Sequence, residues 1–405
     1  MRTIIVRYAE IALKGQNRRD FERRLAGNIR RQLGLERSQI TLQRDQIVLE
    51  VPADGVDEAK ARLATVFGVA WFAEVARTEN RLDAIKQTAF EVAGELLGPR
   101  TSFGVQTRRS DKRAPFTSRQ VNESVGAHLQ AETGAPVDLS NPDVWVRIAV
   151  KRAGAYIFAQ RHQGPGGLPV GTNGRVLSLL SGGFDSIASS YLLAKRGARV
   201  DYLHFHVFPG KEGVLNTKMP DLWSHLSRYT LSQRVYLANY TPFQMAALDL
   251  PMALQRHELV TFRRLMVRVG ERLAEQYGYD GLVLGDSLGQ VASQTMENIS
   301  AVDRAVEIPV FRPLIGMDKV EIVNLVSSIG LEEVAAASYK DCCSIIARHP
   351  STRANLEKIR DVEQWIDAGR VVEAITSSVE IVPAYEGRSE DARERASRRF
   401  IVDMP

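Results

Sequence analysis

The first 75 residues alternate short apolar runs with patterns of helical period. Every fourth residue of the segment 17–33 is apolar, which predicts a helix with one apolar face, and Asn17 can cap its start. The apolar positions of this segment are Phe21, Leu25, Ile29 and Leu33. Strands are also predicted at residues 3–8 and 46–51, and a helix at residues 57–67. This order of elements predicts a small α+β unit that ends near residue 75.

A second unit of similar size is predicted to follow. Helices are predicted at residues 81–97 and 118–132, and strands at residues 102–109, 144–150 and 155–162. Residues 163–174 then contain five Gly and two Pro among twelve residues. Because this composition disfavours regular structure, we interpret the stretch as an interdomain linker.

From residue 175 onwards, short apolar strands alternate with helices. Strands are predicted at residues 176–180, 201–208, 234–240 and 281–287, and the clearest helix at residues 259–278. Buried strands separated by helices predict a parallel, doubly wound sheet, which binds ligands beyond the carboxyl ends of its strands. The predicted fold class is therefore α/β, with this sheet preceded by two small α+β domains. The predicted domains are residues 1–75, 76–165 and 172–385, followed by a charged tail at residues 386–405.

Composition and charge narrow the class of protein. Hydrophobic residues make up 44% and charged residues 25%, as in an ordinary globular protein. No apolar run approaches the roughly 20 residues of a membrane-spanning helix, and no secretory leader forms before Glu10. We therefore expect a cytoplasmic protein with no membrane partner.

The net charge is unevenly distributed along the chain. Residues 1–170 contain 26 Lys and Arg against 19 Asp and Glu, a net charge of +7, whereas residues 171–405 contain 27 against 29, a net charge of −2. The segment from Arg100 to Arg119 alone has six basic residues and one acidic residue. A basic first half indicates a phosphate-rich partner, although solvated arginines on helices are an alternative explanation.

Both cysteines of the chain, Cys342 and Cys343, are adjacent. Such a pair cannot form a disulfide framework, so it is either reactive or a buried, inert feature. No cluster of cysteines and histidines has the spacing of a zinc site, so we predict no metal bound by the protein's side chains alone.

The strongest functional motif is Ser181–Ser186, with the sequence SGGFDS. An apolar strand leads into it, and a helical pattern follows and ends at Gly197. Its glycines let the backbone approach an anion, the helix N-terminus offers unpaired N–H groups, and the serine hydroxyls can add donors. The alternative is a plain strand-to-helix turn capped by Asp185 or Ser186. No Gly-Lys-Ser/Thr follows, so the motif is not a Walker A loop.

This loop resembles the PP-loop of ATP pyrophosphatases, which cleave ATP between the α and β phosphates and adenylate their substrates. Further motifs within residues 1–350 resemble, in the expected order, those of the tRNA 4-thiouridine synthetase (tRNA sulfurtransferase) family. These motifs are RYAEIALKGQNRRDFERRLAGNIRRQL, GPGGLPVGTNGRVLSLLSGGFDS, LHFH, FRRLMVRVGERLAE, LGDSLGQVASQT, RPLIGMDKVEI and YKDCCSI. The resemblance implies a ferredoxin-like domain, then a THUMP domain, then a PP-loop domain. The basic first half would bind tRNA by shape and backbone.

The same resemblance implies an ATP site. The residues implied to bind ATP are Leu179, Leu180, Ser181, Gly182, Gly183, Ser186, His204, Phe205, Arg263, Gly285 and Gln294. The leucines and the phenylalanine would pack against adenine, Gly285 would allow close backbone approach, and Arg263 and Gln294 could fix ribose or phosphate. Three of them have ordinary alternatives: a satisfied strand histidine for His204, a solvated helix residue for Arg263 and a plain polar position for Gln294.

Three catalytic residues are implied as well: Asp185, Lys319 and Cys343. A carboxylate beside a triphosphate can orient Mg²⁺, and a lysine can neutralise charge on the departing pyrophosphate. Cys343, the second cysteine of the pair, would carry a persulfide whose terminal sulfur attacks the activated carbon. Lys319 could instead be an ordinary residue in the first turn of a helix, and the cysteines an inert pair.

The implied reaction is the ATP- and Mg²⁺-dependent adenylation of O4 of uridine 8 in tRNA, followed by persulfide attack at C4 and release of AMP. Some family members have a C-terminal rhodanese domain with its own cysteine. Because no cysteine follows Cys343, we expect a form without that domain, which takes sulfur from a cysteine desulfurase or a separate carrier. Two further departures are Ala9 in place of the usual glycine and Ile187-Ala188-Ser189 in place of the usual Pro-Val-Ala.

Two other functions fit parts of the sequence. Another PP-loop enzyme that makes 2-thiouridine or modifies cytidine would share the loop, but such enzymes lack the paired ferredoxin-like and THUMP segments. An RNA-binding protein with an inactive nucleotide fold would not require SGGFDS, Lys319 and Cys343 together. The sequence leaves open a role in thiamine thiazole synthesis and a monomeric or homodimeric state.

Overall fold

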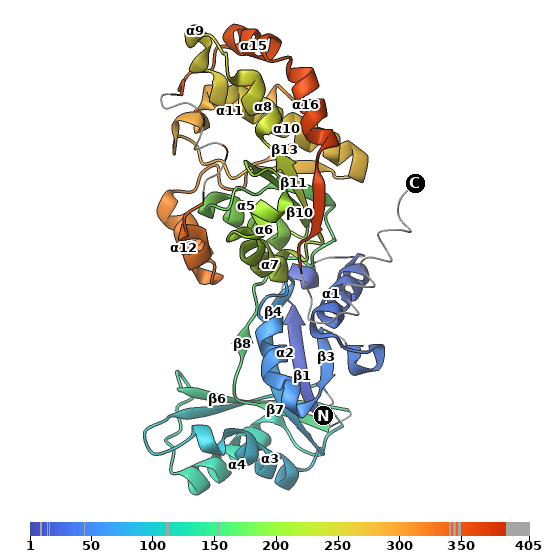
Figure 1. Cartoon of the computed structure of the whole chain (residues 1–405). Coiled ribbons are helices and arrows are strands. Elements are labelled where there is room, and N and C mark those ends of the chain that lie inside the picture. The colour runs from blue at the N-terminus through green and yellow to red at the C-terminus, as the bar shows by residue number, and fades with distance from the viewer. Residues whose placement is uncertain are drawn as a thin grey trace. The chain divides into compact units, whose positions relative to one another are not determined.

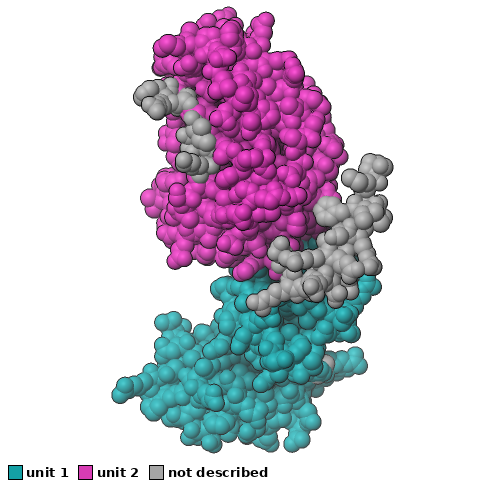
Figure 2. All heavy atoms as spheres, viewed as in Figure 1, with its two compact units in different colours: residues 1–169 teal, residues 170–405 magenta. Residues whose placement is uncertain are grey.

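The computed structural model describes residues 1–385 except 9, 14, 16, 44, 111, 112, 153, 340, 341, 343–345 and 347–349; of residues 12 and 13 only the backbone is described. The chain divides into two compact units, residues 1–169 and 170–405 (Figure 2). Each unit has its own sheet (Figure 1). None of the described helices combines the length and the apolar character that crossing a bilayer requires.

One continuous sheet organises the first unit, in the order β2-β3-β1-β4-β7-β6-β5, with β8 paired to β4. Neighbouring strands are antiparallel except for β5 and β6, which are parallel. The strands are β1 (Arg2–Tyr8), β2 (Ile40–Gln43), β3 (Gln46–Val51), β4 (Val69–Thr78), β5 (Phe103–Arg109), β6 (Val144–Lys151), β7 (Gly154–Phe158) and β8 (His162–Gln163). The helices are α1 (Arg18–Leu33), α2 (Val56–Leu63), α3 (Leu82–Ala93) and α4 (Ser118–Thr133), with short 3-10 turns η1 (Glu10–Leu13), η2 (Arg37–Gln39), η3 (Ala53–Gly55) and η4 (Gly94–Leu96).

Helices cover one face of this sheet. Helices α1 and α2 pack on the core that contains Ile4 and Leu25, and α3 and α4 pack on the core that contains Ile85 and Val121 (Figure 1). Leu25 and Ile29 are fully buried, which confirms the predicted apolar face of α1. Asn17 occupies the cap position of α1, but its side chain makes no capping hydrogen bond. That part of the prediction was wrong.

The strand β4 joins the two halves of the sheet and is absent from the sequence prediction. Phe72 packs on the helix-covered face, whereas Ala73 and Val75 pack on the opposite face. Apolar residues on both faces hide the alternation by which a half-buried strand is recognised. Because β4 crosses residue 75, the two domains predicted within residues 1–169 share a strand; their separate boundaries stay a prediction.

The glycine-rich stretch 163–174 has almost no regular structure, and backbone hydrogen bonds fix both of its ends. The Gly166 carbonyl accepts from the Gly68 N–H at 2.7 Å, within the first unit. The N–H groups of residues 171–173 donate to the Gly197 carbonyl, within the second unit. The division between the two compact units falls between Pro169 and Val170.

The second unit is built on a sheet with the order β13-β12-β9-β10-β11-β14, in which all neighbours are parallel except the edge strand β14. The strands are β9 (Arg175–Leu179), β10 (Arg199–His206), β11 (Arg234–Asn239), β12 (Gly281–Val283), β13 (Val310–Phe311) and β14 (Glu380–Pro383). The helices are α5 (Phe184–Lys195), α6 (Lys211–Leu215), α7 (Met219–Thr230), α8 (Thr241–Ala247), α9 (Met252–Gln255), α10 (Glu258–Tyr277), α11 (Met296–Asp303), α12 (Lys319–Ser328), α13 (Glu332–Ala336), α15 (Leu356–Trp365) and α16 (Ala368–Ser377), with the 3-10 turn η5 (Ala292–Gln294).

This arrangement confirms the predicted doubly wound α/β fold. On one face, Ser178 of β9 hydrogen-bonds Ser190 of α5, and Tyr202 of β10 hydrogen-bonds Thr230 of α7. On the other face, Leu177 belongs to the core formed with α10 and α16. The strand order reverses between β9 and β12, so the loops after these two strands flank the point where such sheets bind ligands.

Candidate active site

The predicted phosphate loop connects β9 to α5 at the carboxyl end of β9. The Ser186 hydroxyl accepts from the Ser181 backbone N–H at 3.2 Å and donates to the Gly183 carbonyl at 3.0 Å, so it closes the loop on itself. Gly182 has φ +90°, and a Cβ there would lie 2.8 Å from Met219 Sδ, so only glycine fits. The N-cap of α5 is Gly183, so neither Asp185 nor Ser186 caps the helix. These contacts hold the loop beside the N-terminus of α5, where backbone N–H groups can bind an anion.

The loop after β12 lies directly against the start of α5. A Cβ on Gly285 would lie 2.7 to 2.9 Å from backbone atoms of Asp185 and Ser186. The two backbones are therefore in contact, and a side chain at position 285 would push them apart. This close approach brings the segment that follows Gly285 to the phosphate loop.

Asp185, in the first turn of α5, joins side chains from two other segments. Its Oδ1 accepts from Lys319 Nζ at 2.8 Å, and its Oδ2 accepts from Gln290 Nε2 at 2.9 Å. Lys319 is the first residue of α12, whose N-cap is Asp318 in a capping box with Glu321. The side chains of Asp185 and Lys319 are 25% and 50% exposed, so a ligand can reach both. The structure thus brings together the two residues that the sequence singled out as an acid and base pair.

Arg263 belongs to a buried ion-pair network with Asp286 and Arg312. One guanidinium nitrogen of Arg263 lies 2.6 Å from Asp286 Oδ1, and Arg312 Nε lies 2.8 Å from Oδ2. Burial alone would raise the pKa of Asp286, but the two guanidinium groups outweigh it and hold that pKa below its ordinary value. Arg263 also donates to the Ser293 carbonyl at 3.0 Å. Arg263 is therefore held in place from two sides and is not a solvated helix residue.

Two buried amide oxygens next to this network lack partners. Gln290 Oε1 and Gln294 Oε1 have no hydrogen-bond partner among the described residues. Gln290 contacts Asp185, and Gln294 follows the residue whose carbonyl binds Arg263. Because buried polar atoms are normally satisfied, we expect a polar ligand to reach these two amides.

The residues predicted to pack against adenine line the ends of β9 and β10. Leu179, Leu180 and Phe205 are all buried, and Phe205 packs edge to face against Phe262 of α10. The structure provides an apolar wall there. Contact of these residues with adenine stays a prediction.

His204 is fully buried, and both of its ring nitrogens are engaged. Nδ1 lies 2.7 Å from the Leu180 carbonyl oxygen and Nε2 lies 2.7 Å from the Tyr339 hydroxyl. A carbonyl only accepts, so Nδ1 carries the proton and Nε2 accepts from Tyr339. Burial lowers the pKa of His204 to about 4. Neither ring nitrogen is available to a nucleotide while these two hydrogen bonds persist.

The neutral state of His204 predicts a pH-dependent loss of stability. Its pKa is lower in the fold than the ordinary value of 6.5, so the unfolded chain takes up a proton that the fold does not. Stability is therefore complete above pH 6.5 and is lost as the pH falls toward 4. Between pH 7.5 and pH 5 the loss from this residue should be about 2 kcal/mol.

The measurement is urea unfolding of the protein and of His204→Asn at both pH values. The free energy of unfolding should depend less on pH in the variant, because the other histidines with lowered pKa, such as His206, His225 and His257, are present in both proteins. An unchanged pH dependence would show that His204 is not held neutral in the fold.

The cysteine pair is only partly described. Cys342 is 2% exposed and packs in the same core as Leu179 and Phe205. Cys343, the predicted sulfur carrier, lies outside the described residues, as does Lys340 of the same motif. The burial of Cys342 favours a packing role for the first cysteine of the pair.

Sequence reasoning missed four residues at this site: Gln290, Asp286, Arg312 and Tyr339. Gln290 and Asp286 lie in the quoted motif LGDSLGQVASQT, and Tyr339 begins YKDCCSI. The motifs were therefore a usable signal, but the hydrogen bonds join residues as far apart as 204 and 339. A single sequence carries no sign of such pairings.

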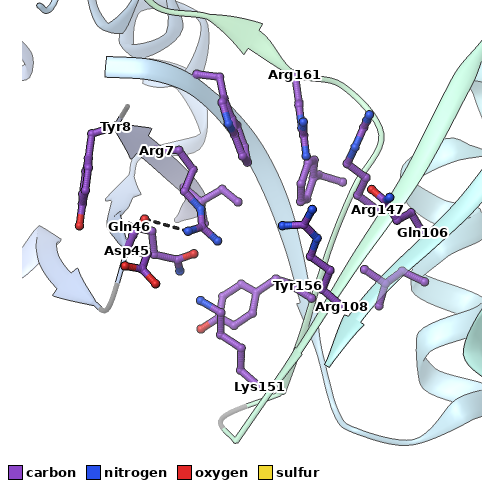
Figure 3. A pocket seen from close by; sticks show the side chains of 15 residues that line it. Arg7, Tyr8, Asp45, Gln46, Gln106, Arg108, Arg147, Lys151, Tyr156 and Arg161 are labelled. Carbon is purple, nitrogen blue, oxygen red and sulfur yellow. Dashed lines mark hydrogen bonds between the residues drawn. The ribbon is translucent and has the colours of Figure 1, made fainter. Parts of the chain in front are cut away.

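A second candidate site lies in the first unit, on the helix-free face of its sheet (Figure 3). It is a cavity of about 370 Å³, large enough for a nucleotide-sized group. Its cationic lining residues are Arg7, Arg108, Arg147, Lys151 and Arg161, and its aromatic ones are Tyr8, Trp71, Tyr156 and Phe158. The Arg161 guanidinium lies 4.2 Å from the centroid of the Trp71 ring, a cation–π contact.

The cations in this cavity are poorly compensated. Of the residues that line it, Asp45 alone carries a carboxylate, and Arg18 of α1 pairs with that group. Partial burial, with added repulsion from neighbouring arginines, lowers the pKa of Arg161 to about 10. Burial also lowers the pKa of Arg147 and Lys151. Burial and mutual repulsion thus disfavour the charged forms of these side chains. A bound polyanion would offset both effects, so the cavity fits phosphate groups.

Only part of the basic segment predicted from the sequence contributes to the cavity. Arg108 points into it, whereas Arg109, the next residue of β5, donates to the carbonyls of Ala114 and Phe116. Adjacent residues of a strand face opposite sides of the sheet, which accounts for the difference. Lys112 lies outside the described residues.

Three family models match the chain. The model for thiamine biosynthesis protein (ThiI) matches residues 171–368, the ThiI ferredoxin-like domain model matches residues 3–73, and the THUMP domain model matches residues 79–160. These matches follow the order that the sequence motifs implied.

Similar proteins cover nearly the whole chain. A probable tRNA sulfurtransferase of Thermus thermophilus is 40% identical over 98% of this chain and 97% of its own length. Another probable tRNA sulfurtransferase, from Caldanaerobacter subterraneus, is 35% identical over 93% of this chain and 98% of its own length. The crystal structure of a 4-thiouridine synthetase–RNA complex with bound ATP matches 95% of this chain and 99% of its own, with a TM-score of 0.84 and 29% identity. The crystal structure of PH1313 from Pyrococcus horikoshii matches 82% of this chain and 100% of its own, with a TM-score of 0.63 and 26% identity.

Proposed function

This chain belongs to the tRNA sulfurtransferase family, and from that membership and its site we infer ATP-dependent thiolation of tRNA, with 4-thiouridine as the product. The observation that carries the inference is the phosphate loop whose Asp185 binds Lys319 and Gln290. Uridine 8 is the proposed target, as the family resemblance implies. A cytoplasmic location is part of the proposal, because tRNA is the substrate.

The residues of the second unit fit ATP. The phosphate loop and the α5 N-terminus would bind phosphates, and the wall of Leu179, Leu180 and Phe205 would take the adenine. The amide oxygens of Gln290 and Gln294 would accept from donors of the ligand, such as ribose hydroxyls or the adenine amino group. Asp286 orients Arg263, and Arg263 and Gln294 would fix ribose or phosphate.

Mg²⁺ fits the site as a companion of ATP. No group of three or more His, Cys, Asp or Glu within the described part of the chain could hold a metal ion unaided. Mg²⁺ is often bound by one carboxylate together with substrate phosphates and water, and Asp185 can supply that carboxylate. The ion would supply neutralisation of phosphate charge, and Lys319 would add a second positive charge beside the loop.

The proposed reaction has two steps. First, O4 of the uracil attacks the α-phosphorus of ATP, the bond to the β-phosphate breaks and pyrophosphate leaves. Second, the terminal sulfur of a Cys343 persulfide attacks C4, and the C4–O bond breaks to release AMP. An external thiol or a second persulfide then attacks the Cys343 sulfur and breaks the S–S bond to the tRNA, so that the tRNA leaves as 4-thiouridine. Cys343 stays joined to the attacking sulfur until a further thiol reduces that bond.

Sulfur has to reach Cys343 as sulfane sulfur, and a cysteine desulfurase or a separate carrier is the proposed donor. Sulfur supply for thiamine thiazole synthesis is a second proposed use, favoured by the match to the thiamine biosynthesis protein model. A homodimer stays a proposal from the sequence. Nucleosides of tRNA from a strain that lacks the gene test the function: 4-thiouridine should disappear, and its unchanged level would contradict the proposal.

The basic cavity of the first unit is the proposed contact with tRNA. Five cationic side chains beside aromatic rings, of which Trp71 is partly exposed, can hold phosphates and stack a base, as single-stranded RNA sites do. The binding should not require ATP, since no residue of the phosphate loop lines this cavity.

Replacing both Arg108 and Arg147 by glutamine should weaken tRNA binding. Each phosphate contact contributes a slope of about 0.7 to 0.9 to the plot of log affinity against log salt, so loss of two contacts should reduce that slope by about 1.4 to 1.8. At about 0.1 M salt the affinity should fall by an order of magnitude or so. Filter binding of the full chain without ATP measures both quantities.

Arg119→Gln is the matched control. Arg119 belongs to the same basic segment, but it lies on α4, is 87% exposed and pairs with Glu123. Its loss should leave the affinity and the salt slope nearly unchanged. Equal weakening by the control would show that the general charge of the first unit, not the cavity, binds tRNA.

A further inference from the structure

One hydrogen bond joins the nucleotide side of the second sheet to the chain that leads into the cysteine pair. The Tyr339 hydroxyl donates to His204 Nε2 at 2.7 Å, and the two rings lie 5.6 Å apart, centroid to centroid. His204 in turn donates from Nδ1 to the carbonyl of Leu180, the residue immediately before the phosphate loop. Tyr339 stands three residues before Cys342.

A second contact fixes the same part of the chain. Lys218 Nζ donates to the carbonyls of Ala335 and Ala337, at 2.8 and 2.7 Å, and so satisfies the C-terminal end of α13. The Lys218 side chain also passes beside the phosphate loop, since a Cβ on Gly182 would lie 3.6 Å from its Cε. The chain from 335 to 339 is thus attached to the phosphate-loop region at two points.

The chain beyond Tyr339 is anchored as well. Cys342 and Ile346 are 2% and 5% exposed and belong to the core that includes Leu179 and Phe205. The described residues Tyr339, Cys342 and Ile346 are therefore fixed relative to the ends of β9 and β10.

We propose that Tyr339 is a positioning residue for sulfur transfer: its hydroxyl, through His204, sets the cysteine-bearing segment relative to the activated uridine. The proposal rests on the proposed function, in which Cys343 carries the sulfur. Adenylation uses ATP bound at the phosphate loop and the side chains around it and needs no sulfur, whereas transfer requires the sulfur within about 3 to 3.5 Å of C4, and a misplacement of about 1 Å can cost about 10²-fold in rate. Loss of this hydrogen bond should therefore impair the second step and spare the first.

The test is Tyr339→Phe in the full chain, which removes one oxygen atom and keeps the ring. Single-turnover formation of 4-thiouridine, with a desulfurase and cysteine supplied, should slow by about 10-fold or more. tRNA-dependent pyrophosphate release and the KM for ATP should stay within about 2-fold of the parent protein. A purely structural role would lower both steps together, so an equal loss in both, or normal thiolation, would overturn the proposal.

Tyr202→Phe is the matched control. Tyr202 lies on the same strand as His204, and its buried hydroxyl bonds Thr230 on the flank of the sheet. This variant loses a comparable buried hydrogen bond and should not separate the two steps. A separation of the same size in Tyr202→Phe would mean that any loosening of β10 suffices, which would also overturn the proposal.

A double-mutant cycle gives an independent reading. His204→Asn removes the acceptor of the Tyr339 hydroxyl, so its loss of thiolation rate should not add to that of Tyr339→Phe. Additive losses would show that the two residues act separately. Cys343→Ser is assayed in parallel to test the sulfur carrier separately from the positioning role of Tyr339. If that variant makes normal 4-thiouridine, Cys343 does not carry the sulfur, whatever the effect of Tyr339→Phe.

Discussion

Replacing Asp185 by asparagine should slow tRNA-dependent pyrophosphate release by about 10²- to 10³-fold and leave the protein folded. The substitution keeps the size of the side chain and its contact with Gln290, but it removes the charge that holds Lys319 Nζ at 2.8 Å and would orient Mg²⁺. Folding should be spared because Gly183, not Asp185, is the N-cap of α5. Release of pyrophosphate under single-turnover conditions measures the effect.

Asp318→Asn is the matched control for charge. Asp318 precedes Lys319 and caps α12, with its carboxylate accepting from the Glu321 N–H. Asparagine is an equally good N-cap, so this variant should release pyrophosphate at nearly the parent rate. Near-normal release by Asp185→Asn would reduce Asp185 to an acidic residue that stabilises the first turn of α5.

Replacing Cys343 by serine should abolish 4-thiouridine formation, by more than about 10³-fold, while pyrophosphate release continues. A serine hydroxyl cannot form a persulfide, whereas adenylation requires the ATP site and no cysteine. Yield of the thionucleoside, with a desulfurase and cysteine supplied, measures the loss. The two half-reactions should therefore separate completely in this variant.

Cys342→Ser is the natural comparison, because the two cysteines are adjacent. Cys342 is 2% exposed within an apolar core, so serine there should cost stability, roughly 1 to 3 kcal/mol, more than it costs chemistry. Thiolation should persist in the folded variant. Full thiolation by Cys343→Ser would end the persulfide assignment, and loss in Cys342→Ser alone would transfer it to the first cysteine.

The periodic parts of the fold could be predicted from the sequence. Short apolar strands separated by helices predicted the parallel sheet, and apolar residues at every fourth position predicted α1. The strand β4 escaped because both of its faces are apolar, so its pattern does not alternate as a half-buried strand does. The single sheet of the first unit depends on β4, which pairs with β1 on one side and β7 on the other. A single sequence does not reveal which strands pair.

The sequence identified many residues of the candidate site, but not the contacts between them. The motifs named Asp185 and Lys319, and the structure adds that they bind each other across 134 positions. The same motifs contained Gln290 and Asp286, whose roles appear only when the loops after β9 and β12 meet at Gly285. Local sequence reports what a loop can bind, whereas contacts between loops depend on the order of strands in the sheet.

ATP-dependent formation of 4-thiouridine is tested most directly by nucleoside analysis of an unmodified tRNA transcript. The transcript is incubated with the purified full chain, ATP, Mg²⁺, a cysteine desulfurase and cysteine. 4-Thiouridine should form only when ATP is present, and it should be absent when uridine 8 of the transcript is replaced by cytidine. Formation of 2-thiouridine, or of 4-thiouridine without ATP, or of no thionucleoside from an active protein and donor, would contradict the proposed function.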